Sequence, residues 1–291
     1  MHGIVLLDKP AGWSSNQALQ KVRWLFQAQK AGHTGNLDPF ATGMLPICLG
    51  EASKTAGFML GRAKTYVARA RLGTATATGD TEGEVVREMP VPELEPDRIR
   101  DVLASFRGEI EQVPPMYSAL KHEGQPLYRL ARAGLEVERK ARRVTVHALE
   151  MRAWEPPLLE FRVYCSKGTY VRTLAEDIAA ALGCCAHLEA LRRLSVDPFR
   201  EGDMVSLEEL EERQSQGQID SCLLPVDAGL ADWPRVELDG ESARRFSHGN
   251  PVADAAGPDG PVRVYDMAGR LLGWGEIQTG QGLRARRIMR L

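Results

Sequence analysis

One carboxylate, Asp38, lies in a stretch whose residue types could fix its direction. The segment "GHTGNLDPFATGMLP", residues 32–46, holds three glycines and two prolines. Gly and Pro break helices and central strands, so we expect a loop here. Pro39 pushes the backbone of Asp38 toward the extended region, and Gly35 and Gly43 permit sharp turns on either side. Such a loop suits a catalytic carboxylate, and it equally suits an ordinary Asp-Pro turn.

A second stretch could supply the partner of that carboxylate. The segment "CSKGTYVRTL", residues 165–174, continues a predicted strand and bends at Gly168. Tyr170 and Arg172 are two positions apart, so they face the same side of an extended chain. An arginine beside a buried carboxylate keeps it ionised by charge and by hydrogen bonding. The simpler alternative is an edge strand with an exposed arginine.

A third stretch carries an aromatic ring. In "KTYVARARLG", residues 64–73, Tyr66 is in phase with Ala68 and Ala70, whose small side chains leave room over the ring. A buried core tyrosine and a ring that stacks on a nucleobase both fit this pattern.

Charge is distributed unevenly along the chain. The 291 residues carry 37 Lys and Arg against 39 Asp and Glu, a net charge of −2, which does not favour a general nucleic-acid binder. However, residues 119–143 hold seven basic and three acidic residues, and the tail "LRARRIMRL" adds four arginines. Two basic patches, the first with Tyr117 and Tyr128 beside it, favour an anionic polymer as ligand. The acidic segment 201–220 is interpreted as a solvated linker face.

Composition excludes several function classes. The five cysteines have no C-x-x-C spacing, and the six histidines form no metal-binding pair, so we expect neither a metal nor a cofactor. No phosphate-binding G-x-x-x-x-G-K-[ST] loop occurs in "LPICLGEASK". No apolar run approaches the ~18 residues of a membrane span, and the first residues do not resemble a signal peptide, so a cytoplasmic location is expected.

The elements that must position these residues are mixed. Alternation and buried runs predict strands over 3–10, 64–73, 142–154 and 159–173, and a polar hairpin after residue 73. Periodicity predicts helices over 14–26, where Ser14 and Gln17 form a capping box, and over 95–108, 174–183 and 186–194, with a short helix plus linker in 206–220. A strand pair follows in 261–278. The order favours an α+β fold, with a catalytic domain over 1–230 and a small β-rich domain over 231–291.

Five ordered motifs resemble the bacterial TruB-type tRNA pseudouridine synthases. They cover residues 6–193, while the tail after Trp233 is similar to a PUA-like RNA-binding domain. Asn36 departs from the Thr, Ala or Ser expected there, which is not a catalytic position. The motifs are "LLDKPAGWSSNQALQKV", "GHTGNLDPFATGMLPICLGEASK", "KTYVARARLGTATATGDTEG", "PPMYSALKHEGQPLYRLARAG" and "CSKGTYVRTLAEDIAAALGCCAHLEALRR".

The resemblance implies a fold and an activity. The fold is a central mixed, mostly antiparallel sheet flanked by helices, with the PUA-like domain at the C-terminus. The reaction converts uridine 55 in the T-loop of tRNA to pseudouridine: the base is flipped out, the C1′–N1 bond breaks, and C1′ bonds to C5. Asp38 is the catalytic carboxylate, which attacks C1′ or removes a proton at C2′. Arg172 pairs with it, and Tyr66 stacks on the base and assists proton removal from C5.

Further roles follow from the same resemblance. Tyr170 and Leu191 line the base pocket, His33 fills the space left by the flipped base, and Lys9 and Lys54 support the loop or contact phosphate. The insert over about 115–143 clamps the T-stem-loop, through Lys121, Arg129, Arg132, Arg139, Lys140, Arg142 and Arg143. No guide RNA, obligate protein partner or membrane is expected. Two alternatives stay open: an RNA-binding tRNA folding chaperone without chemistry, and a guide-RNA-dependent rRNA pseudouridine synthase.

Overall fold

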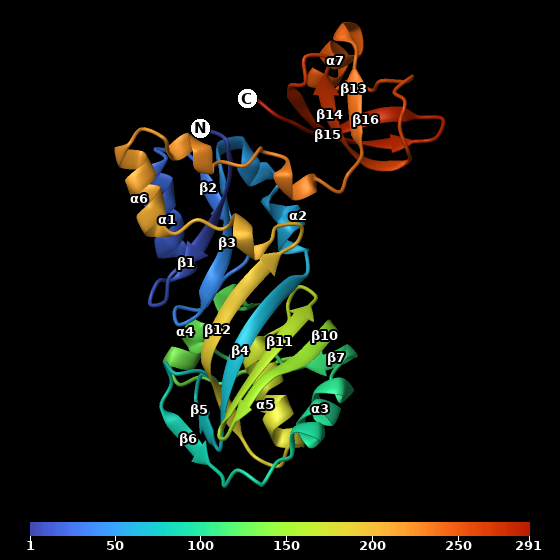
Figure 1. Cartoon of the computed structure of the whole chain (residues 1–291). Coiled ribbons are helices and arrows are strands. Elements are labelled where there is room, and N and C mark those ends of the chain that lie inside the picture. Colours follow the sequence, from blue (N-terminus) through green and yellow to red (C-terminus); the bar gives the residue numbers. More distant parts are fainter.

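The computed structural model describes all residues, 1–291, and is built on one large sheet (Figure 1). Eight strands form it in the order β1-β3-β12-β4-β11-β10-β7, with β2 paired to β3. All pairings are antiparallel except that of β3 with β12. The strands are β1 Gly3–Lys9, β2 Ala31–His33, β3 Thr42–Leu49, β4 Lys64–Leu72, β7 Gly108–Gln112, β10 Arg142–Glu155, β11 Leu158–Cys165 and β12 Ala186–Val196.

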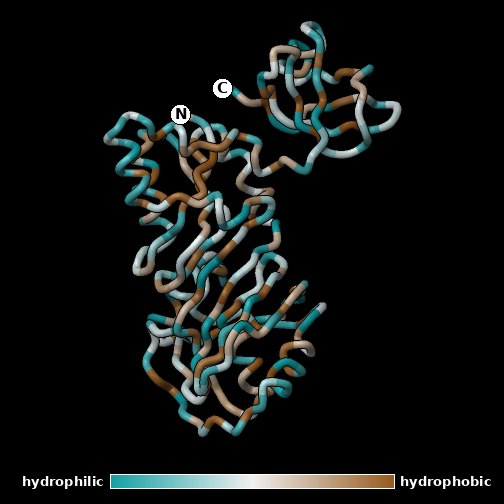
Figure 2. Tube along the Cα trace, viewed as in Figure 1, coloured by the Kyte–Doolittle hydropathy of each residue, from teal (hydrophilic) through white to brown (hydrophobic).

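Hydrophobic patterning explains these strands. In β4, Tyr66, Ala68, Ala70 and Leu72 are buried in the core, and the residues between them face the other side of the sheet. By contrast β1 is apolar along most of its length, because it is covered on both faces. Figure 2 shows the result: apolar residues gather in the strands, and helix α6 (Leu207–Ser215) is mostly hydrophilic.

Helices cover the sheet and complete the core. Helix α1 begins after Ser14, whose side chain and that of Gln17 form the predicted capping box. Helices α3 and α5 pack against β10, β4 and β12, while α1 and α6 pack on each other beside β1 and β3. The helices are α1 Ser15–Leu25, α2 Ala56–Leu60, α3 Pro96–Ser105, α4 Leu127–Arg132, α5 Val171–Ala181, α6 Leu207–Ser215 and α7 Gly240–Ser247, with 3-10 turns η1 Gly50–Lys54, η2 Glu201–Asp203, η3 Ile219–Cys222 and η4 Ala228–Leu230.

The remaining strands form three small sheets. Two hairpins, β5 Thr74–Thr76 with β6 Val85–Glu88 and β8 Lys121–His122 with β9 Gln125–Pro126, project from the main body. At the C-terminus β13 Arg235–Leu238, β14 Gly260–Asp266, β15 Leu271–Gln278 and β16 Gly282–Ile288 form a four-stranded sheet. The α+β architecture with a β-rich C-terminal unit is therefore confirmed. We propose the division into domains 1–230 and 231–291 on the basis of the two separate sheets.

Three local predictions were wrong. Residues 186–194 form strand β12 rather than a helix, because pairing with β4 and β3 in the sheet overrides the helix preference of Ala, Leu, Glu and Arg. The stretch 32–46 is a loop only in part, since Thr42–Pro46 belongs to β3. The strand predicted to reach Thr173 ends at Cys165, and Arg172 lies in the first turn of α5.

Candidate active site

The loop that carries Asp38 is held by hydrogen bonds from several elements. Ser15, at the start of α1, accepts a hydrogen bond from Leu37 N (2.8 Å) and donates one to Leu37 O (3.0 Å). Arg193 donates to the carbonyl oxygens of Asn36 (3.3 Å) and Gly35 (3.2 Å) from below. The loop is therefore fixed before any substrate binds, as a site that must aim one carboxylate requires.

Arg172 joins that carboxylate to two other segments. Its Nε lies 3.0 Å from Asp38 Oδ2, and its Nη1 lies 3.5 Å from Asp80 Oδ2. Nη1 also donates to Thr78 O (2.5 Å), and Nη2 donates to Tyr117 O (2.7 Å) in the basic insert. The side chain is only 4% exposed, so every part of the guanidinium fork is used by the protein itself.

Helix α5 positions this arginine. Tyr170 is its N-cap residue, and the Gln112 side chain bonds the backbone N–H and C=O of Tyr170 at 3.1 and 3.3 Å. Arg172 thus lies in the first turn of α5, two residues after Tyr170, whose backbone is held by Gln112. Tyr170 and Arg172 both line the same pocket, although only Tyr170 has the extended backbone that was predicted for both and Arg172 is helical.

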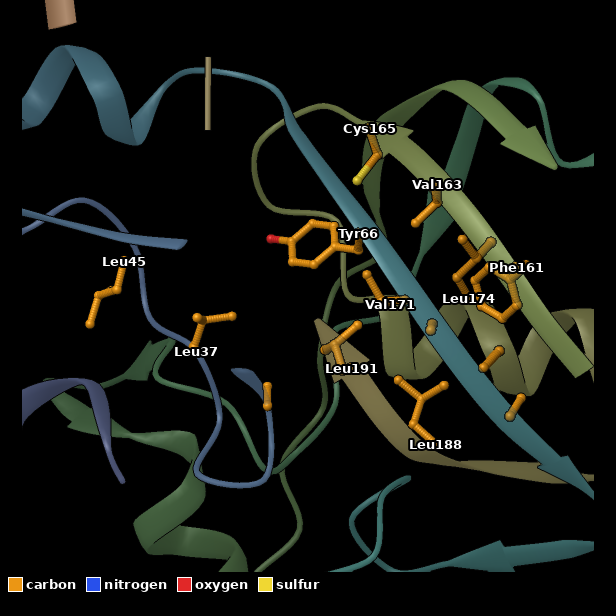
Figure 3. Close-up of a cluster of buried hydrophobic side chains, with 14 of the residues drawn as sticks. Leu37, Leu45, Tyr66, Phe161, Val163, Cys165, Val171, Leu174, Leu188 and Leu191 are labelled. Atoms are coloured by element: carbon orange, nitrogen blue, oxygen red, sulfur yellow. The ribbon is translucent and has the colours of Figure 1, made fainter. Parts of the chain in front are cut away.

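A pocket of about 380 Å³ opens beside Asp38. Tyr66 projects into it from β4, with Leu191 of β12 and Val171 of α5 near the ring and the hydroxyl directed toward Leu37 and Leu45 (Figure 3). Apolar side chains with a few convergent polar groups are typical of a site for a flat, partly polar ligand. The volume and the ring suit one nucleobase.

A second and larger chamber, about 780 Å³, adjoins the first. The two share Asp38 and Arg172, which therefore stand in the wall between them. Most residues that line the second chamber are polar, Asp80 and Glu82 among them, and several, including Tyr117, belong to the insert. The Asp38 carboxylate faces both chambers, whereas Arg172 is buried behind it.

Burial and neighbouring arginines shift the pKa values of the acidic groups in the site in opposite directions. Desolvation by the surrounding protein raises the pKa of Asp38, and the Arg172 guanidinium acts against that rise. Burial likewise raises the pKa of Tyr66, with the Arg193 guanidinium opposing it. Burial lowers the pKa of His33, so its ring is neutral at pH 7.

Three other residues predicted for the site, Lys9, Lys54 and His33, do not line the base pocket. Lys9 is fully buried and its Nζ donates to the carbonyl oxygens of Pro10 (2.9 Å), Trp13 (2.6 Å) and Pro39 (3.2 Å), so it supports the loop and cannot also contact phosphate. Lys54 donates to Ile288 O (3.1 Å) at the C-terminal unit and lines neither chamber. His33 ends β2, is half-buried and lines neither chamber; its Nδ1 has no hydrogen-bond partner.

The insert lies over the site, but its basic residues are not equivalent. Arg132 lines the second chamber, and Lys121, Arg129, Lys140 and Arg142 are exposed without an ion-pair partner. Arg139 instead donates to Pro114 O (3.1 Å) and pairs with Glu136. Arg143 pairs with Glu109 (3.3 Å) and Glu111 (3.8 Å).

Three residues of the site were missed in the sequence. Asp80 and Arg193 lie inside quoted motifs, yet no local pattern separates them from surface charges. Arg193 is 1% exposed because it lies in β12, a strand inside the sheet. The helix predicted for this segment did not imply a buried arginine. Lys64 lines the base pocket at the start of β4, and burial lowers its pKa to about 8.

Comparison with solved structures identifies the fold class. The chain superposes on the structure described as "Crystal Structure of a Cbf5-Nop10-Gar1 Complex" with a TM-score of 0.76 and 25% identity, over 98% of this chain and 84% of that one. A second structure, of an H/ACA RNP bound to a substrate RNA containing 2′-deoxyuridine, gives 0.76 at 22% identity, which supports the fold alone. The architecture is that of the pseudouridine synthases.

Comparison of sequences narrows the class. The model "TruB family pseudouridylate synthase (N terminal domain)" matches residues 23–171, "tRNA pseudouridylate synthase B C-terminal domain" matches 172–231, and "Pseudouridine synthase II TruB, C-terminal" matches 234–289. Two curated proteins, each described as tRNA pseudouridine synthase B, are 51% identical (Pseudomonas aeruginosa) and 50% identical (Nitrosococcus oceani), over 99% of this chain and 96% and 95% of theirs. The chain belongs to the TruB family of pseudouridylate synthases.

Proposed function

We propose that this protein converts uridine 55 in the T-loop of tRNA to pseudouridine, with Asp38 as the catalytic carboxylate. Its membership of the TruB family and its curated relatives make it an isomerase that forms pseudouridine in tRNA. The position in tRNA and the role of each residue are the proposal. The observation that carries it is the Asp38–Arg172 pair in the wall of a pocket that also holds Tyr66.

The geometry accounts for the steps. A uridine inside a stem-loop is out of reach, so it must be flipped at a cost of a few kcal/mol, and stacking on Tyr66 offsets part of that cost. Asp38 then acts on the ribose, at C1′ as nucleophile or at C2′ as base, and both roles need an ionised carboxylate. The C1′–N1 bond breaks, the uracil turns over in the pocket, and C5 bonds to C1′. Asp38 leaves C1′ as that bond forms if it is the nucleophile, or returns the proton to C2′ if it is the base. Tyr66 assists removal of the C5 proton, and N1 gains a proton.

The surrounding residues prepare this chemistry. Arg172 favours the charged form of Asp38 and holds the carboxylate at one place, while Tyr170 and Leu191 limit the movement of the released base. We assign Lys9 to support of the loop from within the protein. The exposed cations of the insert, Lys121, Arg129, Arg132, Lys140 and Arg142, are assigned to RNA phosphates, and His33 to the gap that the flipped base leaves.

The test is tritium release from C5-labelled uridine in a T-arm RNA, without guide RNA or partner protein. We expect release by the unmodified protein and by Asp101→Asn, a control at an exposed position of α3. Asp38→Asn should lose about 10³-fold or more of the rate, because it removes the reacting group. Undiminished release by Asp38→Asn would overturn the assignment.

The same experiment separates the two alternatives. A tRNA folding chaperone without chemistry would release no tritium and would keep its function in Asp38→Asn. A guide-dependent enzyme would need added RNA and proteins before any release occurred. The insert, which can grip RNA directly, favours the stand-alone reaction. No helix is long and apolar enough to cross a membrane, and we propose a cytoplasmic location, where tRNA is processed.

A further inference from the structure

One short segment, residues 51–64, touches both the C-terminal unit and the base pocket. We call this segment, which contains helix α2, the bridge. On its outer side it is tied to the C-terminal unit and the chain leading into it by three polar contacts. These are Arg290 N to Glu51 Oε2 (2.8 Å), Lys54 Nζ to Ile288 O (3.1 Å) and Arg62 Nη2 to Asp232 Oδ1 (2.6 Å).

Aromatic contacts reinforce the outer side. The Phe58 ring meets Trp233 edge-on at 4.8 Å between centroids and Trp274 at 5.5 Å. Such pairs contribute ~1 kcal/mol each beyond their buried area. The next residue, Met59, is fully buried in an apolar cluster to which both units contribute, Trp274 among them. The bridge and the C-terminal unit are therefore packed directly against each other.

The inner side of the bridge forms part of the base pocket. Leu60 lines the pocket with Asp38 and Tyr66. Lys64 lines it too, and its Nζ donates to Leu60 O (3.3 Å) and Arg62 O (2.6 Å), which ties the end of α2 to the start of β4. Phe58 and Leu60 are two residues apart in one helix, roughly 200° around its axis, so they face opposite sides.

We propose that the C-terminal unit positions the wall of the base pocket through this bridge, with Phe58 as the positioning residue. The inference rests on the proposed function. Packing of Trp233 and Trp274 against Phe58 fixes the place of α2, and α2 fixes Leu60 beside the base. Packing of the C-terminal unit thereby acts on the rate of reaction. A displacement of ~1 Å at a reacting site can cost 10²-fold in rate.

The test measures the single-turnover rate of tritium release with enzyme in excess, and separately the Kd for the same tRNA. Phe58→Ala should lower the rate about 10-fold and change the Kd less than about 2-fold. Phe58→Tyr, which keeps the ring, should restore the rate to within about 1.5-fold. Met267→Ala, at an exposed turn of the C-terminal unit, is the control and should match the unmodified protein.

A second variant keeps the inference testable if Phe58→Ala does not fold. Arg62→Met removes the contact with Asp232 and should lower the rate about 3-fold in the same direction. Loss of affinity with an unchanged rate, in either folded variant, would overturn the inference, because the C-terminal unit would then only bind RNA. An unchanged rate and Kd in both would also overturn it. An inactive unmodified protein would instead count against the proposed function.

Discussion

Asp38, the proposed reacting group, combines two features that oppose each other: a charged carboxylate and partial desolvation by the surrounding protein. Desolvation raises the pKa of Asp38. The guanidinium of Arg172, which is only 4% exposed, stabilises the ionised carboxylate and opposes that rise. Asp80 adds a second carboxylate to the same arginine, which also raises the pKa of Asp38. The site thus keeps a carboxylate that is more basic than a solvated one, as suits either proposed role.

The first prediction is a pH dependence. As pH falls through the raised pKa of Asp38 the carboxylate is protonated, so the single-turnover rate should fall on the acid side at a higher pH than an ordinary aspartate would give.

A raised folded pKa also means that ionisation of Asp38 destabilises the fold, a contribution absent below pH 3.8 and complete above the folded pKa. Asp38→Asn should therefore unfold at a higher urea concentration at pH 7. A midpoint lowered relative to the unmodified protein would contradict this.

The second prediction concerns the fork of Arg172. Arg172→Lys keeps the charge but cannot reach Asp38, Asp80 and two carbonyl oxygens together. We expect about a 10²-fold lower single-turnover rate. Arg162→Lys, at an exposed position of β11, should have no effect. A rate within 3-fold of the unmodified protein would show that charge alone is sufficient.

At the scale of elements, the site depends on where β3 and β12 touch. They pair at only two positions, Thr42 with Arg192 and Gly43 with Arg193, and Arg193 then supports the Asp38 loop. Gly43 has φ +99°, and a Cβ there would lie 2.2 Å from Arg193 O. Only glycine allows the two strands this close approach.

The third prediction tests that contact. Gly43→Ala should lower the free energy of unfolding by about 3 kcal/mol or more, from backbone strain and a direct clash. Gly240→Ala, in helix α7 with no atom within 4 Å of a new Cβ and no positive φ, should change it by less than about 0.5 kcal/mol. Urea unfolding of both variants gives the comparison, and equal midpoints would refute the argument.

The fourth prediction concerns the insert. Neutralising Arg139, Lys140, Arg142 and Arg143 together should weaken tRNA binding and flatten its salt dependence. The structure divides this set: Lys140 and Arg142 are free, whereas Arg139 and Arg143 have protein partners. Lys140→Ala with Arg142→Ala should account for most of the loss, with the log–log salt slope reduced by about 1 to 2. Arg139→Ala with Arg143→Ala is the matched control, and an equal loss from both pairs would contradict the division.

At the scale of the whole molecule, the two units share one apolar cluster and one buried ion pair. Asp227 is 6% exposed, pairs with Arg263 at 3.0 Å, and accepts a hydrogen bond from the Tyr265 hydroxyl. These contacts lie outside the active site and hold the C-terminal unit against the segment that leads into it. The net charge of −2 gives no information about where the basic groups lie, because the fold sets their positions.

The fifth prediction follows from Asp227. Asp227→Asn leaves Arg263 without its charge partner and should cost about 3 kcal/mol in the free energy of unfolding. Asp232→Asn breaks the more exposed pair with Arg62 and should cost less than about 1 kcal/mol. Calorimetry of both variants checks the order, and we expect the transition of Asp227→Asn to broaden or split as the units separate. The reverse order of stabilities would be incompatible with this account.

By itself, the sequence determined what depends on neighbouring residues. Periodicity predicted β1, β4 and α1 with its Ser14–Gln17 cap, because caps and alternation act over a few positions. The five ordered motifs indicated the family, and the resemblance assigned roles to Asp38, Tyr66 and Arg172 that their residue types alone left open. These were open to prediction because each is a local chemical pattern.

Only the tertiary structure decided which distant segments meet. Residues 186–194 became a strand because the sheet had a place for them between β3 and β4, and that place buried Arg193 beneath the Asp38 loop. It also brought Asp80 to Arg172, turned Lys9 inward and placed Lys54 against the C-terminal unit. Burial and long-range pairing set these roles, and neither can be deduced from the residues beside each position.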